Sequence, residues 1–268
     1  MPPKVSIGMP VFNCARTVTT AIEALLNQTY KNIEIIISDN ASTDGTGIIC
    51  EKYAASDQRV RYVLQTENIG PVANFKFVRS QSSGDYFMWA AGDDSHSKFF
   101  IERACEVLDE NPDVGLVFCG MATVNIDTGE RQRSITGFSN SSSKFSRVFF
   151  RSINPCASLI YGLHRRTLVM EMPLERYDYC DLLIGIWYEL RSKIQIIPLV
   201  LYYAGTTEDR IPYSLENRGI SYRRYMRELN KLLNSNFCFL NSTILALLNL
   251  HLISKTTRKH NRVVKLRG

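Results

Sequence analysis

The stretch VSIGMPVFNCARTVTTAIEALLNQTYKNIEIIISDNASTDGT (Val5–Thr46) alternates between two kinds of hydrophobic pattern. Lys4–Val11 is a short β-type run, and Ile33–Asp39 is rich in isoleucine, as buried parallel strands are. Between them, Ala15–Gln28 places its apolar residues at helical spacing. The pattern predicts a strand, a helix and a second strand, which is the repeating unit of an α/β fold.

The same alternation continues to about residue 120. A second helix is predicted over Ser42–Ser56, which opens with capping residues, and a third strand over Val60–Gln65. A third helix over Gly70–Gln81 and a fourth strand over Gly84–Ala90 follow. Repeated β-α units with short connections predict a mostly parallel central sheet with helices on both faces.

Polar side chains follow each of the four predicted strands. In an open α/β sheet, ligands bind beyond the carboxyl ends of the strands. Two adjacent carboxylates such as Asp93 and Asp94 are also typical of a surface turn. A turn, however, does not explain why polar residues follow all four strands. The sequence therefore predicts one binding site at this edge, formed by Asn13, Cys14, Asp39, Asn40, Glu67, Asn68, Asp93 and Asp94.

Composition and charge exclude several classes of protein. The chain has 268 residues, of which 45% are hydrophobic and 22% charged, as in a globular protein with a sizeable core. Its net charge of +6 resides in the tail, because twelve Lys/Arg and two acids follow from Arg210 onward. No nucleic-acid-binding module accompanies these basic residues, so nucleic acid is disfavoured as a partner.

Cysteine usage favours a reducing compartment. The seven cysteines are scattered and form neither a CxxC pair nor a Cys/His cluster, so a zinc site is not expected. The N-terminus lacks the long apolar core of a secretory signal. We expect a cytoplasmic protein with reduced thiols.

The chain changes character after about residue 120. Strands are predicted around a turn at Asp127–Gly129, followed by a serine-rich loop over Ser139–Phe145. Pro155–Leu168 is predicted to be a strand that runs into a helix. An amphipathic helix over Tyr177–Lys193 and a strand over Ile194–Ala204 complete this part, and the chain is expected to be helical from about residue 214.

In order and spacing, these motifs resemble the family-2 inverting, nucleotide-sugar-dependent glycosyltransferases with the GT-A fold. The resemblance runs from about Val5 to about Tyr203 and is diffuse after Gly120. It implies a Rossmann-like GT-A catalytic domain over residues 1–210, with a nucleotide-sugar-binding half (1–120) and an acceptor half (121–210), and a helical, basic C-terminal appendage over residues 211–268. The motifs that carry it are PVFN (Pro10–Asn13), QTY (Gln28–Tyr30), DNASTDGT (Asp39–Thr46), NIGPVANF (Asn68–Phe75) and GDYFMWAAGDD (Gly84–Asp94).

The resemblance implies a divalent cation, Mg²⁺ or Mn²⁺, at the paired aspartates. Asp94 is the better candidate metal ligand, and Asp93 is placed nearer the ribose or the sugar. Carboxylate oxygens suit such hard ions, and an ion that bridges two phosphates neutralises the charge that develops on the leaving group. The family's frequent D-x-D-D form has an acid where this chain has Ala91, so the metal contact depends on Asp93 and Asp94.

The resemblance also implies a set of nucleotide-sugar-binding residues. Asp39 stands where the family contacts the base, and a carboxylate can accept the imide N–H of uracil or thymine, which favours UDP- or dTDP-sugars. The alternative for Asp39 is a turn or helix-cap role. Two further members have structural alternatives. Asn13 could be only a turn residue, and Asn74 could be only an exposed helix residue. The other members of the set are Pro10, which shapes the turn, Val11 and Phe12, whose backbone lies along the base, Asn40 and Asp93.

Inverting transfer needs a general base that takes the proton of the acceptor hydroxyl. The family's base begins a helix that precedes a G-K/R…I-P-x-L-Y-Y strand, and Asp181 stands at the matching place, with Ser192 in place of the usual glycine. Asp178 is a rival, because a shift of one helical turn is permitted. Both acids could instead simply favour the N-terminus of the helix.

Three basic side chains are weaker candidates. His96 is near enough in sequence to the paired aspartates to contact substrate. Arg165 and Arg166 could meet phosphate, although solvated surface arginines are the simpler interpretation.

The predicted activity is metal-assisted transfer of a sugar, with inversion, from a nucleoside diphosphate sugar to a hydroxyl of a saccharide or lipid-linked acceptor. One alternative is a non-catalytic nucleotide-sugar-binding protein of the same fold. Another is a sugar nucleotidyltransferase, which would want a glycine-rich loop with Lys or Arg after the first strand. The acids of the site favour an enzyme over a non-catalytic binding protein. The segment PVFNCARTV is not a glycine-rich loop, which disfavours the nucleotidyltransferase.

The tail combines an uncharged segment with a basic cluster. Leu232–Ser254 is too polar for a confident membrane span, but its apolar residues can share one helical face. KTTRKHNRVVKLRG follows with six Lys/Arg and no acid. This pattern suits peripheral contact with the anionic inner face of a membrane. The alternative is packing on the catalytic domain or on a second subunit of a homo-oligomer.

Overall fold

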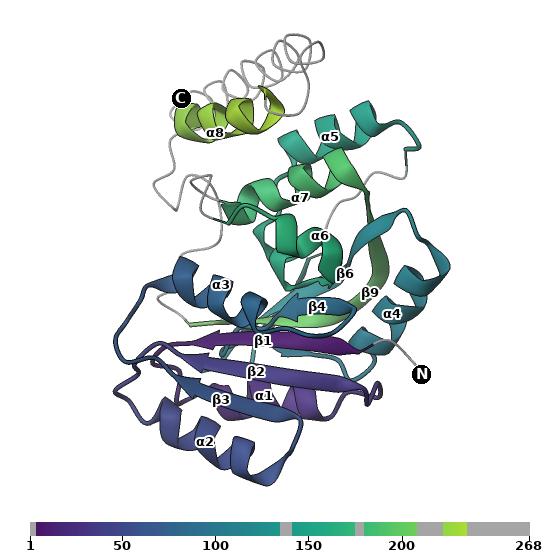
Figure 1. Ribbon diagram of the computed structural model, residues 1–268. Coiled ribbons are helices and arrows are strands. Elements are labelled where there is room, and N and C mark those ends of the chain that lie inside the picture. The colour runs from purple at the N-terminus through teal and green to yellow at the C-terminus, as the bar shows by residue number, and fades with distance from the viewer. Residues whose placement is uncertain (1–3, 135–140, 175–179, 208–221, 235–268) are drawn as a thin grey trace, which may run out of the picture.

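One nine-stranded sheet runs through the part of the chain that the computed structural model describes, which is residues 4–134, 141–174, 180–207 and 222–234. The strand order is β3-β2-β1-β4-β8-β6-β9-β5, and β7 pairs with β6 outside this path. Helices cover both faces of the sheet (Figure 1). The prediction of an α/β fold with a helix-flanked central sheet is therefore confirmed.

The first half of the sheet is parallel. Its strands are β1 (Val5–Val11), β2 (Ile33–Asp39), β3 (Val60–Leu64) and β4 (Tyr86–Trp89). They pair in parallel, with β1 in the centre between β2 and β4. Helix α3 (Pro71–Ser80) lies on one side of these strands, and α1 (Val18–Leu26) and α2 (Thr46–Ser56) lie on the other (Figure 1). Because both faces are covered, β1 and β2 need near-continuous apolar runs, and Ile35, Ile36 and Ile37 are fully buried.

The second half of the sheet is mixed, which differs from the mostly parallel sheet that was predicted. β8 runs antiparallel to both β4 and β6, β9 runs parallel to β6, and β5 runs antiparallel to β9. The hairpin of β6 and β7 confirms the predicted strands around Asp127–Gly129. The strands of this half are β5 (Ser95–His96), β6 (Val114–Asn125), β7 (Arg131–Ser134), β8 (Leu163–Arg165) and β9 (Lys193–Thr206).

The helices of the second half partly follow the predictions. Pro155–Leu168 forms a 3-10 turn, the short strand β8 and the start of a helix, instead of one strand that enters a helix. Helix α4 lies between the predicted elements and buries Phe100, Ile101, Ala104, Cys105 and Leu108. The helices are α4 (Phe100–Glu110), α5 (Lys144–Ile153), η1 (Ala157–Tyr161), α6 (Arg166–Glu171), α7 (Cys180–Arg191) and α8 (Tyr222–Asn234).

Several sequence predictions concern residues outside the described ranges. The boundary near residue 210, Asp178, and most of Leu232–Ser254 with its basic tail lie there. Across the described residues, no helix combines the length and the apolar composition needed to cross a membrane. Cys14, Cys50, Cys105, Cys119 and Cys156 are free thiols.

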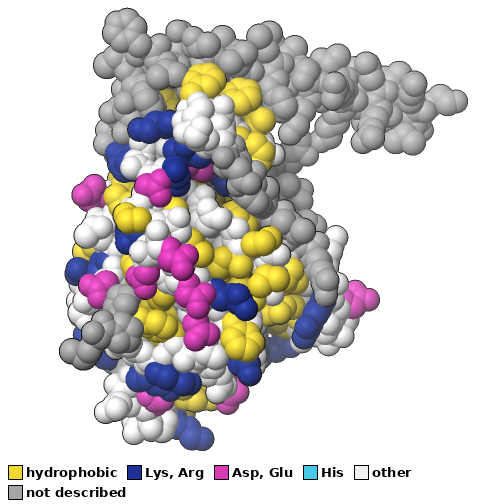
Figure 2. Space-filling view, turned by 90° about the vertical axis from the view of Figure 1, so that its right-hand side faces the viewer, with side chains coloured by type: hydrophobic (Ala, Val, Ile, Leu, Met, Phe, Trp, Pro, Cys, Tyr) yellow, Lys and Arg dark blue, Asp and Glu magenta, His cyan; other side chains and the backbone are white. Residues whose placement is uncertain are grey.

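The amino ends of the parallel strands β1 to β4 lie on one side of the molecule. β1 starts beside the N-terminus at the right of Figure 1, so the carboxyl ends of β1 to β4 point to the opposite side. Figure 2 looks onto the amino-end side, where acidic side chains gather in the middle of the face. Helix α4, whose Glu106, Asp109 and Glu110 are exposed, also lies at the right of Figure 1. This acidic face is thus separate from the edge that carries Asp93 and Asp94.

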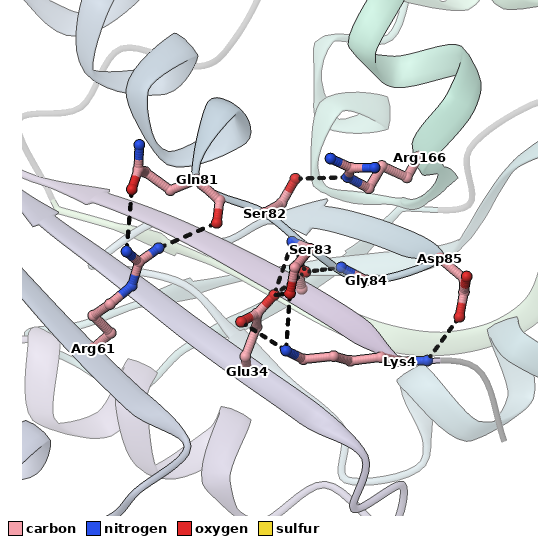
Figure 3. A network of polar contacts seen from close by, with 10 residues as sticks. Lys4, Glu34, Arg61, Gln81, Ser82, Ser83, Gly84, Asp85 and Arg166 are labelled. Atoms are coloured by element: carbon pink, nitrogen blue, oxygen red, sulfur yellow. Dashed lines mark hydrogen bonds and ion pairs between the residues drawn. The ribbon is translucent and has the colours of Figure 1, made fainter. Parts of the chain in front are cut away.

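A polar network centred on Glu34 ties the amino ends of β1 and β2 to the turn before β4 (Figure 3). The Glu34 carboxylate accepts hydrogen bonds from Lys4 Nζ (2.9 Å), from the Ser6 hydroxyl, and from Ser83 N (3.0 Å) and Oγ (2.8 Å). Burial by itself would raise the pKa of Glu34, but the hydrogen bonds from Ser6, Lys4 and Ser83 outweigh it and lower the pKa to about 2.

Glu34→Gln is expected to destabilise the protein in a pH-dependent way. The depressed pKa means that the carboxylate contributes stability above its ordinary pKa of 4.5, and that this contribution is lost as the pH falls toward 2. At pH 7 we expect a loss of about 1–2 kcal/mol in the free energy of unfolding, which shrinks between pH 4.5 and pH 3. Urea unfolding of the variant and the wild type at pH 7, 4.5 and 3 measures this difference in the free energy of unfolding.

The matched control is Glu51→Gln, since Glu51 is exposed on α2. It should stay within about 0.5 kcal/mol of the wild type. A loss in Glu34→Gln that is equal at all three pH values would contradict the role of the Glu34 charge.

Candidate active site

The loops after β1 and β2 are held together by side chain–backbone hydrogen bonds. Asn13 has a positive φ of 46°, its N–H donates to the Ser42 hydroxyl (2.9 Å), and its Oδ1 accepts from Thr43 N (2.9 Å). Cys14 N donates to Thr46 Oγ1 (2.8 Å), and Ala15 N donates to Asp44 (3.0 Å). The turn role of Asn13 is therefore present in the structure, and it fixes the loop that follows Pro10–Phe12.

Asp39 ends β2 as a buried carboxylate with two partners. Its Oδ1 accepts from Ser42 N (2.9 Å), and its Oδ2 accepts from the Tyr62 hydroxyl (3.0 Å). Only 1% of the residue is exposed. Because a carboxylate offers about four lone-pair sites, these two bonds leave capacity for a further donor. Asp39 thus has a turn role, and a contact with a base stays a prediction.

Two buried asparagines link the ends of β1, β2 and β3. Asn40 donates to Asn68 Oδ1 (2.8 Å), accepts from Ile69 N (2.9 Å), and its own N–H donates to Val11 O (2.9 Å). Asn74 on α3 donates to Ser38 O (3.0 Å), and among the described residues its buried Oδ1 has no hydrogen-bond partner. Asn74 is therefore not an exposed helix residue, since only 2% of it is exposed.

The paired aspartates after β4 have different environments. Asp94 is 8% exposed, and its Oδ2 accepts from the buried Tyr202 hydroxyl while its Oδ1 accepts from Gly205 N (2.9 Å). Asp93 is half-buried. The carboxylate predicted to be the better metal ligand, that of Asp94, thus bonds to the end of β9.

The loop after β1 packs on Gly92, the residue that precedes the paired aspartates. A Cβ atom at Gly92 would lie 2.6 Å from Cys14 Sγ, so the backbone at Gly92 is as close to Cys14 as packing allows. Burial raises the pKa of the Cys14 thiol to about 11, which does not suit a nucleophile. The predicted convergence of the ends of β1, β2 and β4 at one edge is therefore what the structure shows.

The donor set at this edge fits one divalent cation. Asp93 and Asp94 supply hard carboxylate oxygens, and Mg²⁺ is commonly held by one or two carboxylates together with substrate phosphates. Within the described residues there is no group of three or more His, Cys, Asp or Glu that could hold a metal by itself.

The proposed base lies on the other half of the fold. Asp181 is in the first turn of α7, is half-buried, and its Oδ1 accepts from Leu182 N (3.0 Å). This bond is the helix-start role that was the alternative for Asp181. Helix α7 packs on η1, whose Tyr161 ring stacks 5.7 Å from the Tyr202 ring. The rival Asp178 lies outside the described residues.

The three weaker candidates do not face this edge. His96 is buried against Phe100 and Tyr202, and burial lowers its pKa to about 4. Arg165 donates to Val114 O (2.7 Å) and to the carbonyl of Leu108 near the end of α4. Arg166 donates to Ser82 Oγ (3.3 Å) at the amino-end network of Figure 3. The His96 ring therefore packs behind Tyr202 inside the fold, and both arginines bond away from the paired aspartates.

Tyr202 and Gly205 are site residues that the sequence did not single out. Both belong to β9, and both bond to Asp94. The sequence did contain the L-Y-Y end of a predicted strand, but nothing in that motif indicates that Tyr202 or Gly205 bonds to Asp94. An exposed ion pair, Arg16–Asp127 (2.8 Å), also joins the loop after β1 to the β6–β7 turn.

Comparison with known proteins connects this arrangement to a family. The model of the family described as "Glycosyl transferase family 2" matches residues 6–167. The Bacillus subtilis (strain 168) protein EpsE is 37% identical over 120 residues, which are 44% of this chain and 43% of EpsE. Glycosyltransferase GlyG of Streptococcus pneumoniae serotype 4 is 36% identical over 107 residues, which are 40% of this chain and 35% of GlyG. The matched stretch thus spans less than half of each relative.

Solved structures share the fold over most of the chain. Residues 1–349 of S. aureus TarS, in complex with UDP-GlcNAc, match with a TM-score of 0.70 at 21% identity, over 91% of this chain and 70% of that one. Mannosyltransferase PcManGT from Pyrobaculum calidifontis, in complex with GDP-Man and Mn²⁺, matches with a TM-score of 0.60 at 16% identity, over 94% and 71% of the two chains. The fold of this chain is therefore the GT-A fold of these glycosyltransferases.

Gly92→Ala is expected to destabilise the protein by about 1–3 kcal/mol, because its methyl group would overlap Cys14 Sγ. The double variant Gly92→Ala/Cys14→Ala should recover at least half of that loss, since the next contacts, with Cys14 Cβ and Val11, would lie at 3.4 Å. Urea unfolding of both single variants and the double variant closes the cycle. Additive losses would contradict a direct contact between the two loops.

Proposed function

The chain belongs to glycosyl transferase family 2, and we propose that it transfers a sugar with inversion from a nucleoside diphosphate sugar to an acceptor hydroxyl. The observation that carries the proposal is the meeting of the ends of β1, β2 and β4 at one edge, with the carboxylates Asp39, Asp93 and Asp94. The complexes of TarS with UDP-GlcNAc and of PcManGT with GDP-Man support it, because both proteins share this fold.

The proposed donor is a UDP- or dTDP-sugar. Asp39 retains acceptor capacity for an imide N–H, and the Phe12 ring, 48% exposed at the rim, offers an apolar surface to a base. Asn13 and Asn40 hold the loops that would surround the nucleotide. Pro10, Val11, Asn74 and Asp93 complete the proposed donor site.

The proposed metal ligands are Asp94 and Asp93. Mg²⁺ or Mn²⁺ held there would neutralise the negative charge of the diphosphate leaving group. The Mn²⁺ in the PcManGT complex supports this assignment, because that protein has the same fold.

The proposed general base is Asp181, with Asp178 as its rival. The acceptor oxygen attacks the anomeric carbon on the face opposite to the diphosphate, and its proton passes to the carboxylate. The new carbon–oxygen bond forms as the bond to the diphosphate breaks, which inverts the anomeric centre. A base on the acceptor half, away from Asp93 and Asp94, suits this geometry.

The acceptor is proposed to be a saccharide or a lipid-linked saccharide. Residues 121–210 would supply its site, and residues 211–268 would form an appendage to the catalytic domain of residues 1–210. The basic residues that follow Ser254 would favour the anionic inner face of a membrane, and the apolar face of Leu232–Ser254 would pack there or on a second subunit.

Metal-dependent turnover of the donor tests the proposal. In a screen of UDP-, dTDP- and GDP-sugars with Mn²⁺, we expect hydrolysis of a UDP- or dTDP-sugar, with release of the nucleoside diphosphate as the measurement. Asp94→Asn should lower this rate by about 100-fold or more, since several kcal/mol of charge stabilisation are lost. The amide keeps the shape of Asp94 and an oxygen for Gly205 N, so the fold should persist.

The control is Asp85→Asn at the amino-end edge, where Asp85 accepts from Lys4 N (3.1 Å), and it should keep wild-type turnover. Near-normal activity of Asp94→Asn would refute the metal assignment. Donor binding without any turnover in the wild type would favour the non-catalytic alternative.

Asp181→Asn is expected to bind the donor as the wild type does and to lose turnover by about 10²–10⁴-fold, because the proton acceptor is removed. A thermal-shift titration with the donor measures binding, and nucleotide release measures turnover. Asp178→Asn is the matched comparison and should remain active. The reverse result would assign the base to Asp178, one turn earlier.

A further inference from the structure

The Asp94 carboxylate connects the two halves of the fold. It follows β4, the last strand of the parallel half, and both of its oxygens accept hydrogen bonds from β9 in the mixed half. The donors are the Tyr202 hydroxyl and Gly205 N, which are three residues apart on that strand. A carboxylate bonded on both oxygens is held in one orientation.

Tyr202 is itself held rigidly. Only 1% of it is exposed, and its ring lies 5.1 Å from His96, 5.6 Å from Phe118 and 5.7 Å from Tyr161, measured between ring centroids. These rings come from β5, β6 and η1, so three separate elements fix the position of the hydroxyl. The donor to Asp94 is therefore preorganised.

Gly205 has a second contact with the pair. A Cβ atom at Gly205 would overlap the carbonyl oxygen of Asp93. The end of β9 thus presses against the backbone of Asp93 while its N–H bonds to the side chain of Asp94. Any larger residue at this position would displace both aspartates.

We propose that Tyr202 and Gly205 are positioning residues for the metal site, which hold the Asp94 carboxylate in the orientation in which it binds the cation. The inference rests on the proposed function, since it takes Asp94 as a metal ligand. Groups that bond to a metal ligand fix its orientation, and their loss commonly lowers metal affinity 10- to 100-fold. Neither residue need touch the ion or the donor.

The same strand also joins the metal site to the proposed base. β9 begins at Lys193, directly after α7, and α7 carries Asp181 in its first turn. The strand therefore follows the carboxyl end of the helix whose first turn carries Asp181, and its own far end bonds to the metal ligand. A rigid connection of this kind would keep the two reacting groups on opposite sides of one sugar.

Direct measurement of Mn²⁺ binding to the 268-residue chain tests the proposal. Free Mn²⁺ is titrated by electron paramagnetic resonance in the presence of saturating UDP, and in parallel with dTDP and GDP. We expect Tyr202→Phe to bind Mn²⁺ about 10-fold or more weakly than the wild type. Gly205→Ala should also bind Mn²⁺ more weakly than the wild type.

Two controls separate positioning from general stability. Tyr188→Phe removes another buried tyrosine hydroxyl, which contacts His164 Nδ1 (2.7 Å), and should keep wild-type Mn²⁺ affinity. Tyr203→Phe alters the next residue of β9, whose hydroxyl donates to Val200 O (3.4 Å), and should also keep it. Urea unfolding of each variant confirms that it is folded at the titration temperature.

The outcomes are distinct. Wild-type Mn²⁺ affinity in Tyr202→Phe would overturn the positioning inference and leave the proposed function standing. An equal loss in Tyr188→Phe would also overturn it, since the effect would then be one of stability. A wild-type chain that binds no Mn²⁺ with any of the three nucleotides would overturn the metal assignment and the inference together.

Discussion

The parallel pairing of β1 with both β2 and β4 is the constraint on which the rest of the structure depends. Val5 pairs with Ile33 on one side and with Tyr86 on the other, so the three strands advance in step and end at the same edge. Helices bury both faces, and a shift of one residue would turn every side chain to the opposite face. The loops that carry Asn13, Asp39 and Asp93 therefore have no freedom to separate.

This convergence brings like charges together, and the structure offsets the cost with hydrogen-bond donors. The buried carboxylates of Asp39 and Asp94 each accept two hydrogen bonds from the protein. Such bonds compensate for the hydration that a carboxylate loses when it is buried. The same bonds give Asp39 and Asp94 structural roles in addition to the proposed chemical ones.

The acceptor half is stabilised differently, by helices that pack over the mixed strands. Arg147 of α5 and Glu189 of α7 form a buried ion pair at 2.8 Å. Burial raises the pKa of Glu189, and the hydrogen bond from Arg147 opposes that shift. A buried pair of this kind adds little net stability but fixes the relative positions of the two helices. The helix that carries Asp181 in its first turn is therefore anchored to α5 by this ion pair.

The sequence by itself determined the parallel half of the fold and the edge where its polar residues meet, because both follow from local periodicity and from the rule that parallel strands end together. It also placed Asp39, Asp93 and Asp94 at that edge. It did not determine the mixed order β8-β6-β9-β5, the burial of His96, or the bonds of Asp94 to Tyr202 and Gly205. Strand partners and hydrogen-bond partners that lie far apart in the sequence leave no periodic signal, so only the tertiary structure decides them.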